Sequence, residues 1–267
     1  MVSDVPVHYA EYGSGIPILA LHGAGVDHRE IAGALEPILS NVPGFRRLYP
    51  VLPGMGLTPA PETLTSNDDV LDILLGLIDS SIGSEPFLVM GHSYGGYLAH
   101  GIANLRPAQA VGLALICPVG AHTRDAPKHE VLVSSADLTG DLEPDLEATY
   151  RDYFVVQTTE TLRRFQEHVA PAIPLVDDSS LTRIFSHWEL RERPEAAEAY
   201  PHPALVLAGR QDATAGHTGA RELIEHIPRG TLAILDRAGH ALIHEQPQLM
   251  QALVAEWLTR VRAHSNR

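Results

Sequence analysis

A serine flanked by glycines stands where an apolar strand gives way to a helix. Residues 91–95 read GHSYG, a G-x-S-x-G pattern, directly after the apolar residues 87–90. From residue 94 onward the apolar side chains recur at helical spacing. A sharp strand-to-helix turn of this kind holds the serine hydroxyl out at the head of a helix, where orphan N–H groups favour developing negative charge. The pattern predicts that Ser93 is a nucleophile. The alternative is a glycine-rich turn with an incidental serine.

A serine hydroxyl needs a base that accepts its proton. Among 15 histidines, His240 follows an apolar strand in the loop RAGH, which places it at a strand's carboxyl end, on the same edge as Ser93. His244 lies four residues later, and such a pair could bind a metal on a helix, but no third ligand presents itself. We therefore predict that His240 is the base and that no metal is bound. His92 belongs to the turn itself, with its side chain directed away from that of Ser93, and we interpret it as structural.

The base needs a carboxylate that fixes its tautomer. The segment ALVLAGRQD ends a strand and brings Asp212 to the same edge, before His240 in the chain. An aspartate in a turn after glycine is common, so Asp212 alone would be weak evidence. The order Ser, Asp, His makes the functional interpretation the better one. The main alternative position is empty, because no acid follows the strand ending at Cys117 before Asp125.

The reaction also needs donors for an oxyanion. We predict that the backbone N–H of Tyr94, the residue after the nucleophile, is one of them. The second is assigned to the backbone N–H of Ala24, in the small-residue segment LHGAG that ends another strand. That segment could also be a plain turn at a strand end. A glycine-rich phosphate-binding loop is the less favoured interpretation, because no lysine follows in the required pattern.

Strand and helix patterns alternate along both ends of the chain. Apolar strand-like segments at residues 5–13, 16–25, 45–56, 87–90, 109–120, 202–212 and 231–240 are separated by helical patterns at 29–39, 66–83, 94–105 and 216–227, and a final helix starts at Pro247. Ser66 or Asn67 is expected to cap the second helix. This alternation predicts an α/β fold with a mostly parallel, doubly wound sheet of about eight strands and helices on both faces. Residues 120–200 lack this recurrence of apolar strand patterns. We therefore expect them to form a helical lid inserted between the core segments 1–119 and 201–267.

Composition narrows the class of protein. The chain has 267 residues, with 19 Lys and Arg against 33 Asp and Glu, so its net charge is −14. An acidic surface repels phosphate backbones, which argues against a nucleic-acid partner. No apolar run approaches the ~20 residues of a membrane span, the start resembles no signal peptide, and Cys117 is the single cysteine. We expect a cytoplasmic protein that acts on a small molecule without cofactor, and the oligomeric state cannot be read.

Together these segments resemble the alpha/beta hydrolase family. GHSYGG and AGHALIHEQP, at the correct order and spacing, carry the resemblance, while HGAG and GRQD add to it. VLPGMGLT is similar to a family loop that usually contains Asp where Val51 stands, which puts the hydrogen bonding of that loop in question. The family includes esterases, lipases, thioesterases, lactonases, C–C bond hydrolases and cofactor-free haloperoxidases. Its epoxide hydrolases and dehalogenases use an Asp nucleophile, which Ser93 argues against.

The resemblance implies a serine hydrolase that cleaves a small to medium, uncharged or mildly polar ester, thioester or lactone through an acyl-enzyme. C–C bond cleavage or a lyase reaction on the same triad is the alternative, and a non-catalytic ligand-sensing receptor is a third hypothesis. Arg163 and Arg164 could meet a substrate carboxylate but suit a solvated helix face better. Aromatic residues of the lid suit packing of a helical layer as well as substrate contact. The residues expected to contact substrate are His22, Gly23, Tyr153, Phe154 and Trp188.

Overall fold

The protein is built around one seven-stranded sheet. The structure, a computed structural model, describes residues 5–120, 123, 125–135, 138, 142–194 and 199–265. The sheet strands are β1 (Tyr9–Gly13), β2 (Ile16–Leu21), β3 (Phe45–Pro50), β4 (Phe87–His92), β5 (Ala110–Ile116), β8 (Ala204–Gly209) and β9 (Gly230–Leu235). Their spatial order is β1-β3-β2-β4-β5-β8-β9. β1 pairs antiparallel with β3, and every other pair in this sheet is parallel.

The mostly parallel sheet predicted from the alternation is confirmed. Strands β4 and β8 are buried along their whole length, as expected for apolar runs covered on both faces. Seven strands form the sheet where about eight were expected. Each of the seven strand-like segments in the sequence produces one of these strands, and no further apolar segment in the described residues is left to supply another.

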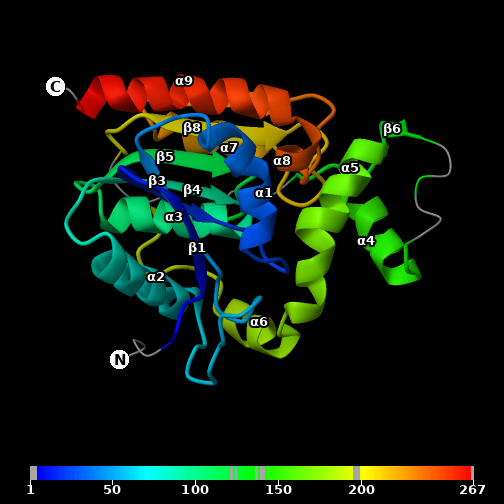
Figure 1. Ribbon diagram of the computed structural model, residues 1–267, viewed down its shortest axis with the longest axis horizontal. Coiled ribbons are helices and arrows are strands. Elements are labelled where there is room, and N and C mark those ends of the chain that lie inside the picture. The colour runs from blue at the N-terminus through cyan, green and yellow to red at the C-terminus, as the bar shows by residue number, and fades with distance from the viewer. Residues whose placement is uncertain are drawn as a thin grey trace.

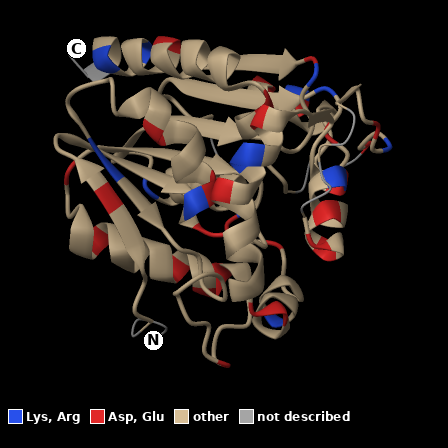
Figure 2. Ribbon diagram, turned by 45° about the vertical axis from the view of Figure 1, so that its right-hand side comes forward, with Lys and Arg blue, Asp and Glu red and all other residues tan. Residues whose placement is uncertain are grey.

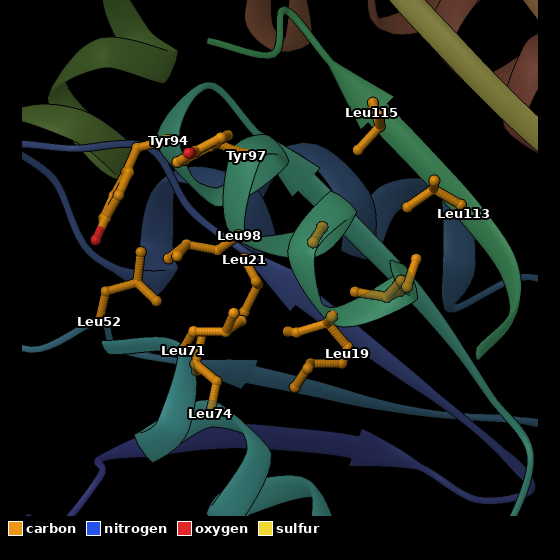
Figure 3. Packing of buried hydrophobic residues seen from close by; sticks show 14 of the residues in the cluster. Leu19, Leu21, Leu52, Leu71, Leu74, Tyr94, Tyr97, Leu98, Leu113 and Leu115 are labelled. Carbon is orange, nitrogen blue, oxygen red and sulfur yellow. The ribbon is translucent and has the colours of Figure 1, made fainter. Parts of the chain in front are cut away.

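Helices cover both faces of the sheet (Figure 1). The helices of the core are α1 (His28–Leu39), α2 (Asn67–Ser81), α3 (Tyr94–Leu105), α7 (Thr218–Glu225), α8 (Leu242–Glu245) and α9 (Pro247–Ser265). One hydrophobic cluster joins α2, α3 and α7 to the sheet, and a second joins α1, α8 and α9 to the opposite face. Figure 3 shows the first cluster, in which Leu98 of α3 and Leu71 of α2 pack toward Leu19 and Leu21 of β2.

Local sequence explains where the helices begin. Ser66 caps α2: its hydroxyl accepts from the Asp69 N–H while the Asp69 carboxylate accepts from the Ser66 N–H. The predicted N-cap at Ser66 or Asn67 is therefore confirmed at Ser66. Asp27 caps α1 in the same position by accepting from the Arg29 N–H at 3.0 Å. These caps fix the entrance of both helices, and α1 follows the HGAG loop directly.

The segment between β5 and β8 is mostly helical. It contains α4 (Pro144–Tyr153), α5 (Thr159–Arg164), a π-helix (Phe165–Val169), a 3-10 helix (Ala170–Leu175) and α6 (Asp178–Phe185), with a two-residue pair of parallel strands, β6 (Val133–Ser134) and β7 (Val156–Gln157). Tyr150, Phe154 and Phe165 of this segment belong to a small third apolar cluster, which also contains Val26 and Ala241. Figure 1 shows α4 and α5 together at one side of the core. None of the helices that the structure describes is long and apolar enough to cross a membrane.

Candidate active site

Ser93 occupies a strained turn between β4 and α3. Its backbone has φ 52° and ψ −118°, in a region that residues with a side chain rarely adopt. The turn is very tight: a Cβ at Gly91 would overlap the carbonyl oxygen of Gly95, and a Cβ at Gly95 would overlap the carbonyl oxygens of Leu21 and His22. Glycine at both positions is therefore required by close backbone packing.

Three side chains predicted to act together meet at the carboxyl edge of the sheet. His240 Nε2 lies 2.8 Å from Ser93 Oγ. On the other side of the ring, His240 Nδ1 lies 2.9 Å from Asp212 Oδ2 and 3.1 Å from Oδ1. The hydrogen-bond chain Asp212–His240–Ser93 thus spans segments that are 147 residues apart in the sequence.

Asp212 is fully buried, with other donors besides His240. The N–H groups of Thr214 and Ala215 donate to Oδ1 at 2.9 and 2.8 Å. Burial alone would raise the pKa of Asp212, but the interaction with His240 and these two N–H groups outweighs it and holds the pKa below its usual value. The carboxylate is therefore charged at neutral pH and favours a proton on His240 Nδ1, which leaves Nε2 free to accept one from Ser93.

The two predicted oxyanion donors lie on either side of Ser93. Tyr94 is the first residue of α3, so its N–H has no helical carbonyl four residues earlier to bind. The HGAG loop lies close by, because a Cβ at Gly23 would stand 3.4 Å from the Ser93 Cβ. Ala24, the next residue, lines the same cavity as Ser93 and His240. Tyr94 and Ala24 thus lie near Ser93 on two separate elements, so their role as oxyanion donors stays a prediction.

A cavity of about 370 Å³ opens over Ser93. One wall is formed by the loop and helix after β2, and the other by α4 and the helical turns that follow α5. Gly23 and Tyr153, two of the residues expected to contact substrate, line it. The described lining residues are Gly23, Ala24, Gly25, Val26, Glu30, His92, Ser93, Thr149, Asp152, Tyr153, Val169, Ile173 and His240.

The other three expected substrate contacts do not line this cavity. His22 is fully buried, and its Nε2 accepts from the Leu52 N–H at 2.9 Å. It thereby anchors the VLPGMGLT loop, in which the buried Val51 replaces the family's Asp. Phe154 lies in the apolar cluster with Tyr150. Trp188 stacks on Tyr97 with the two rings 7° from parallel. All three rings contact other parts of the protein: His22 anchors a loop, and Phe154 and Trp188 pack against aromatic neighbours.

Sequence reasoning missed two residues beside the nucleophile. Glu30 of α1 and His92 of the turn both line the cavity, and His92 Nδ1 lies 2.6 Å from Glu30 Oε1. His92 was interpreted as a structural residue pointing away from Ser93, yet its ring centroid stands 5.0 Å from that of His240. Glu30 follows the HGAG segment on the first turn of a helix. An acidic residue at that position is usually explained by its favourable interaction with the helix dipole. Only the fold shows that its carboxylate points inward.

Glu245 is a third missed residue, and it holds the loop that carries His240. Its carboxylate accepts from the N–H groups of Gly239 at 2.6 Å, Val155 at 2.7 Å and Val156 at 3.0 Å. Gly239 precedes His240, while Val155 and Val156 belong to the segment between β5 and β8. This one side chain therefore ties the predicted base to the wall of the cavity.

The site does not suit a metal ion. In the described part of the chain, His92, Cys117 and His240 offer ligand atoms within 4.8 Å of one another. Both ring nitrogens of His240 already face Asp212 and Ser93. Burial raises the pKa of the Cys117 thiol well above its usual value, whereas a metal requires the thiolate. A metal pair of His240 and His244, the alternative that the sequence analysis considered and did not favour, meets the same objection at His240.

Charge is distributed over the outside of the molecule and sparse within the cavity. Figure 2 shows the acidic residues spread over several helices and loops rather than gathered into one patch. Arg163 and Arg164, the cations that the sequence offers for a substrate carboxylate, pair with Glu160, and Arg163 also pairs with Glu167. Neither arginine is among the residues that line the cavity.

Comparison with known proteins agrees with this architecture. A family model described as "Alpha/beta hydrolase family" matches residues 18–252. The AB hydrolase superfamily protein YfhM of Bacillus subtilis is 26% identical over 96% of this chain and 95% of its own. A 2-hydroxymuconate semialdehyde hydrolase of Pseudomonas sp. is 22% identical over 98% and 94%. The crystal structure of an alpha/beta superfamily hydrolase from Oenococcus oeni matches with a TM-score of 0.90 and 29% identity, covering 96% of each chain.

We expect Gly95→Ala to destabilise the protein by about 1–3 kcal/mol or more, because the added methyl group would overlap backbone oxygens of Leu21 and His22 that cannot move independently. Urea unfolding of the purified variant measures this change. Gly76→Ala is the matched control: Gly76 lies inside α2, a Cβ there meets nothing within 4 Å, and alanine should stabilise the helix by about 0.5–1 kcal/mol. Equal stability of the two variants would contradict the tight turn.

Proposed function

Because the chain belongs to the alpha/beta hydrolase family, we propose that it is a serine hydrolase that cleaves a small to medium carboxylic ester, thioester or lactone through an acyl-enzyme. The observation that carries the proposal is the continuous hydrogen-bond chain from the buried Asp212 through His240 to Ser93 Oγ, which ends in a cavity of about 370 Å³. A nucleophile, a base and an orienting acid in this geometry suit acyl transfer.

In the first half of the reaction Ser93 attacks the carbonyl carbon of the substrate. His240 Nε2 accepts the hydroxyl proton as the Oγ–C bond forms, and the charged Asp212 stabilises the imidazolium that results. The N–H groups of Tyr94 and Ala24 bind the oxyanion of the tetrahedral intermediate. His240 then returns the proton to the leaving alcohol or thiol. In the second half, water attacks the acyl-serine with His240 as base, and the acid is released.

The lining of the cavity favours a neutral substrate. No Lys or Arg is among its described residues, whereas Glu30 and Asp152 contribute carboxylates. A substrate carboxylate would lose its hydration there without gaining a lysine or arginine partner. The one His beside Glu30, His92, is already paired with that carboxylate. The volume lies at the small end of the range for ligand pockets, roughly 300–1,000 Å³, which suits a short or medium acyl chain.

We propose that residues 120–200 act as a lid over the core segments 1–119 and 201–267. Thr149, Asp152 and Tyr153 of α4 face the HGAG loop across the cavity, together with Val169 and Ile173. Their removal would leave Ser93 open to solvent. Exclusion of bulk water strengthens the charge interactions of the site and protects the acyl-enzyme until a water molecule is bound in position.

C–C bond cleavage is the second candidate. The match of almost the whole chain to a 2-hydroxymuconate semialdehyde hydrolase favours it, since that name specifies a semialdehyde substrate and not an ester. The absence of Lys and Arg from the described cavity lining argues against a negatively charged substrate such as a muconate. Accumulation of an acyl-serine during turnover of the true substrate separates the two reactions.

We further propose that the protein acts on a small molecule in the cytoplasm, without a nucleic-acid or membrane partner. The net charge of −14 opposes binding to phosphate backbones. Cys117, the single cysteine, is buried and has no disulfide partner in the chain, which suits a reducing compartment.

Ser93→Ala is expected to lower the turnover of p-nitrophenyl butyrate by about 10⁴-fold or more, because the variant lacks the hydroxyl that is hydrogen-bonded to His240 Nε2. The release of p-nitrophenolate measures the rate, and labelling with a fluorophosphonate probe should disappear in parallel. Ser80→Ala is the control, since Ser80 lies at the exposed end of α2 and bonds only to the Leu77 carbonyl. Retention of activity and labelling by Ser93→Ala would refute the mechanism.

The carboxylate of Asp152 should make the cavity discriminate between matched esters, because the other carboxylate of the lining, Glu30, is paired with His92. We expect kcat/KM for p-nitrophenyl butyrate to exceed that for mono-p-nitrophenyl succinate by about tenfold or more, because two like charges roughly 10 Å apart repel by about 1.7 kcal/mol at an effective dielectric constant of 20. Asp152→Asn, at the exposed mouth, should reduce the ratio, and added salt should do the same. A preference for the anionic ester would show that a cation outside this lining binds the substrate.

A further inference from the structure

A second pair of buried titratable groups lies beside Ser93 and takes no part in the proton transfers above. The side chains of Glu30 and His92 are 1% and 2% exposed, and His92 Nδ1 stands 2.6 Å from Glu30 Oε1. The opposite ring nitrogen, Nε2, lies 2.9 Å from the carbonyl oxygen of His240. His92 therefore bridges the first turn of α1 and the main chain of the residue that serves as base.

Both ring nitrogens of His92 face groups that can only accept. A carboxylate oxygen lies 2.6 Å from Nδ1 as an ion pair without hydrogen-bond geometry, and a carbonyl oxygen lies 2.9 Å from Nε2 in a hydrogen bond. A neutral ring would place a lone pair against one of these oxygens. The imidazolium form favours both contacts, because its charge pairs with Glu30 while its Nε2–H donates to the His240 carbonyl. A charged donor also forms a stronger hydrogen bond to the His240 carbonyl than a neutral one would.

The surroundings keep this pair charged. Burial alone would lower the pKa of His92, but Glu30, the His240 carbonyl and Asp212 outweigh it, so that the pKa is raised. Burial alone would raise the pKa of Glu30, yet His92, and to a lesser extent His244 and His22, hold it at about 2. The Tyr153 hydroxyl of α4 also donates to Glu30 Oε1 at 3.3 Å.

These shifts fix the pH range of the pair. The pKa of Glu30 falls from 4.5 to about 2 on folding, so its contribution to stability is complete above about pH 4.5 and is lost as the pH falls toward 2. The raised pKa of His92 means that its contribution is lost only as the pH rises through that folded value. At neutral pH both members contribute.

We propose that Glu30 is a positioning residue: it keeps His92 doubly protonated, and the His92 ring then holds the main chain of His240 so that its imidazole faces Ser93. This inference rests on the proposed function, in which His240 is the base. The connection runs from α1 through the turn to the His240 loop and leaves the proton path untouched. Through the Tyr153 hydroxyl it also reaches α4, so the wall of the cavity and the base share one buried carboxylate.

The charge of His92 can be measured in the unmodified protein. Histidine labelled with ¹⁵N reports by NMR whether one or both ring nitrogens carry a proton, and the signals that vanish in His92→Gln assign the residue. We expect both nitrogens of His92 to be protonated at pH 7, above the usual pKa of a histidine, which is about 6.5. A His92 ring that is neutral at pH 7 overturns the proposal.

Kinetics of two Glu30 variants test the positioning itself. Glu30→Gln keeps the shape and a hydrogen bond but loses the charge, so we expect kcat for p-nitrophenyl butyrate to fall about tenfold. Glu30→Met loses both, and a displaced base should reduce kcat by about 100-fold. KM should stay within about threefold in each variant, because Glu30 positions the base and does not bind the neutral ester.

Glu36→Gln is the matched control. Glu36 lies on the same helix and pairs with Arg47 at 2.8 Å, away from His92, so kcat should change less than twofold. Wild-type kcat in folded Glu30→Gln and Glu30→Met, or a rise in KM alone, overturns the proposal. Loss of ester turnover in Ser93→Ala tests the proposed function separately, so an intact hydrolase with insensitive Glu30 variants rejects only the inference.

Discussion

The strained backbone at Ser93 is the constraint on which the rest of the site depends. A non-glycine residue in such a conformation costs on the order of 1–3 kcal/mol and persists only where the surrounding structure determines it. Here the Ser93 N–H donates to the Ile116 carbonyl at 2.9 Å, and its own carbonyl accepts from Gly96 at 2.9 Å. Gly91 and Gly95 let the neighbouring main chains close around it. The sheet thereby stabilises the one conformation that presents the hydroxyl to His240.

Three buried carboxylates surround this turn, each neutralised in a different way. Asp212 accepts from His240 and two N–H groups, Glu245 accepts from three N–H groups, and Glu30 pairs with His92. An uncompensated buried charge on Asp212 or Glu30 would cost several kcal/mol. Burial raises the pKa of Glu245 to about 7, and its three N–H donors oppose that rise. Each carboxyl group therefore specifies where its partners must lie. The partners come from the His240 loop, from α1 and from the segment between β5 and β8. Hydrogen bonds and ion pairs of these buried carboxyl groups therefore join separate segments at the carboxyl edge of the sheet.

The sequence predicted those features that depend on local pattern. The apolar runs give the seven strands, the G-x-S-x-G turn gives Ser93, and parallel strands ending on one edge bring Asp212 and His240 to it. Ring partners depend on packing between distant segments, so His22, Phe154 and Trp188 were assigned to substrate although each has a partner in the interior. The role of Glu30 could not be predicted for the same reason. It depends on contact with His92, 62 positions further along the chain, and no local pattern links the two residues.

The anchoring of the proposed lid limits how a substrate can reach Ser93. Lifting the whole segment would take the Val155 and Val156 N–H groups from Glu245 and the Tyr153 hydroxyl from Glu30. Leaving buried acceptors without donors costs about 1–3 kcal/mol for each group, and Glu245 would keep only its bond from Gly239 in the His240 loop. Thr149 and Asp152, in contrast, are exposed and line the cavity. Movement of these side chains at the mouth admits a small ester while Glu245 and Glu30 keep His240 in place, which favours a short path over α4 rather than opening of the entire segment.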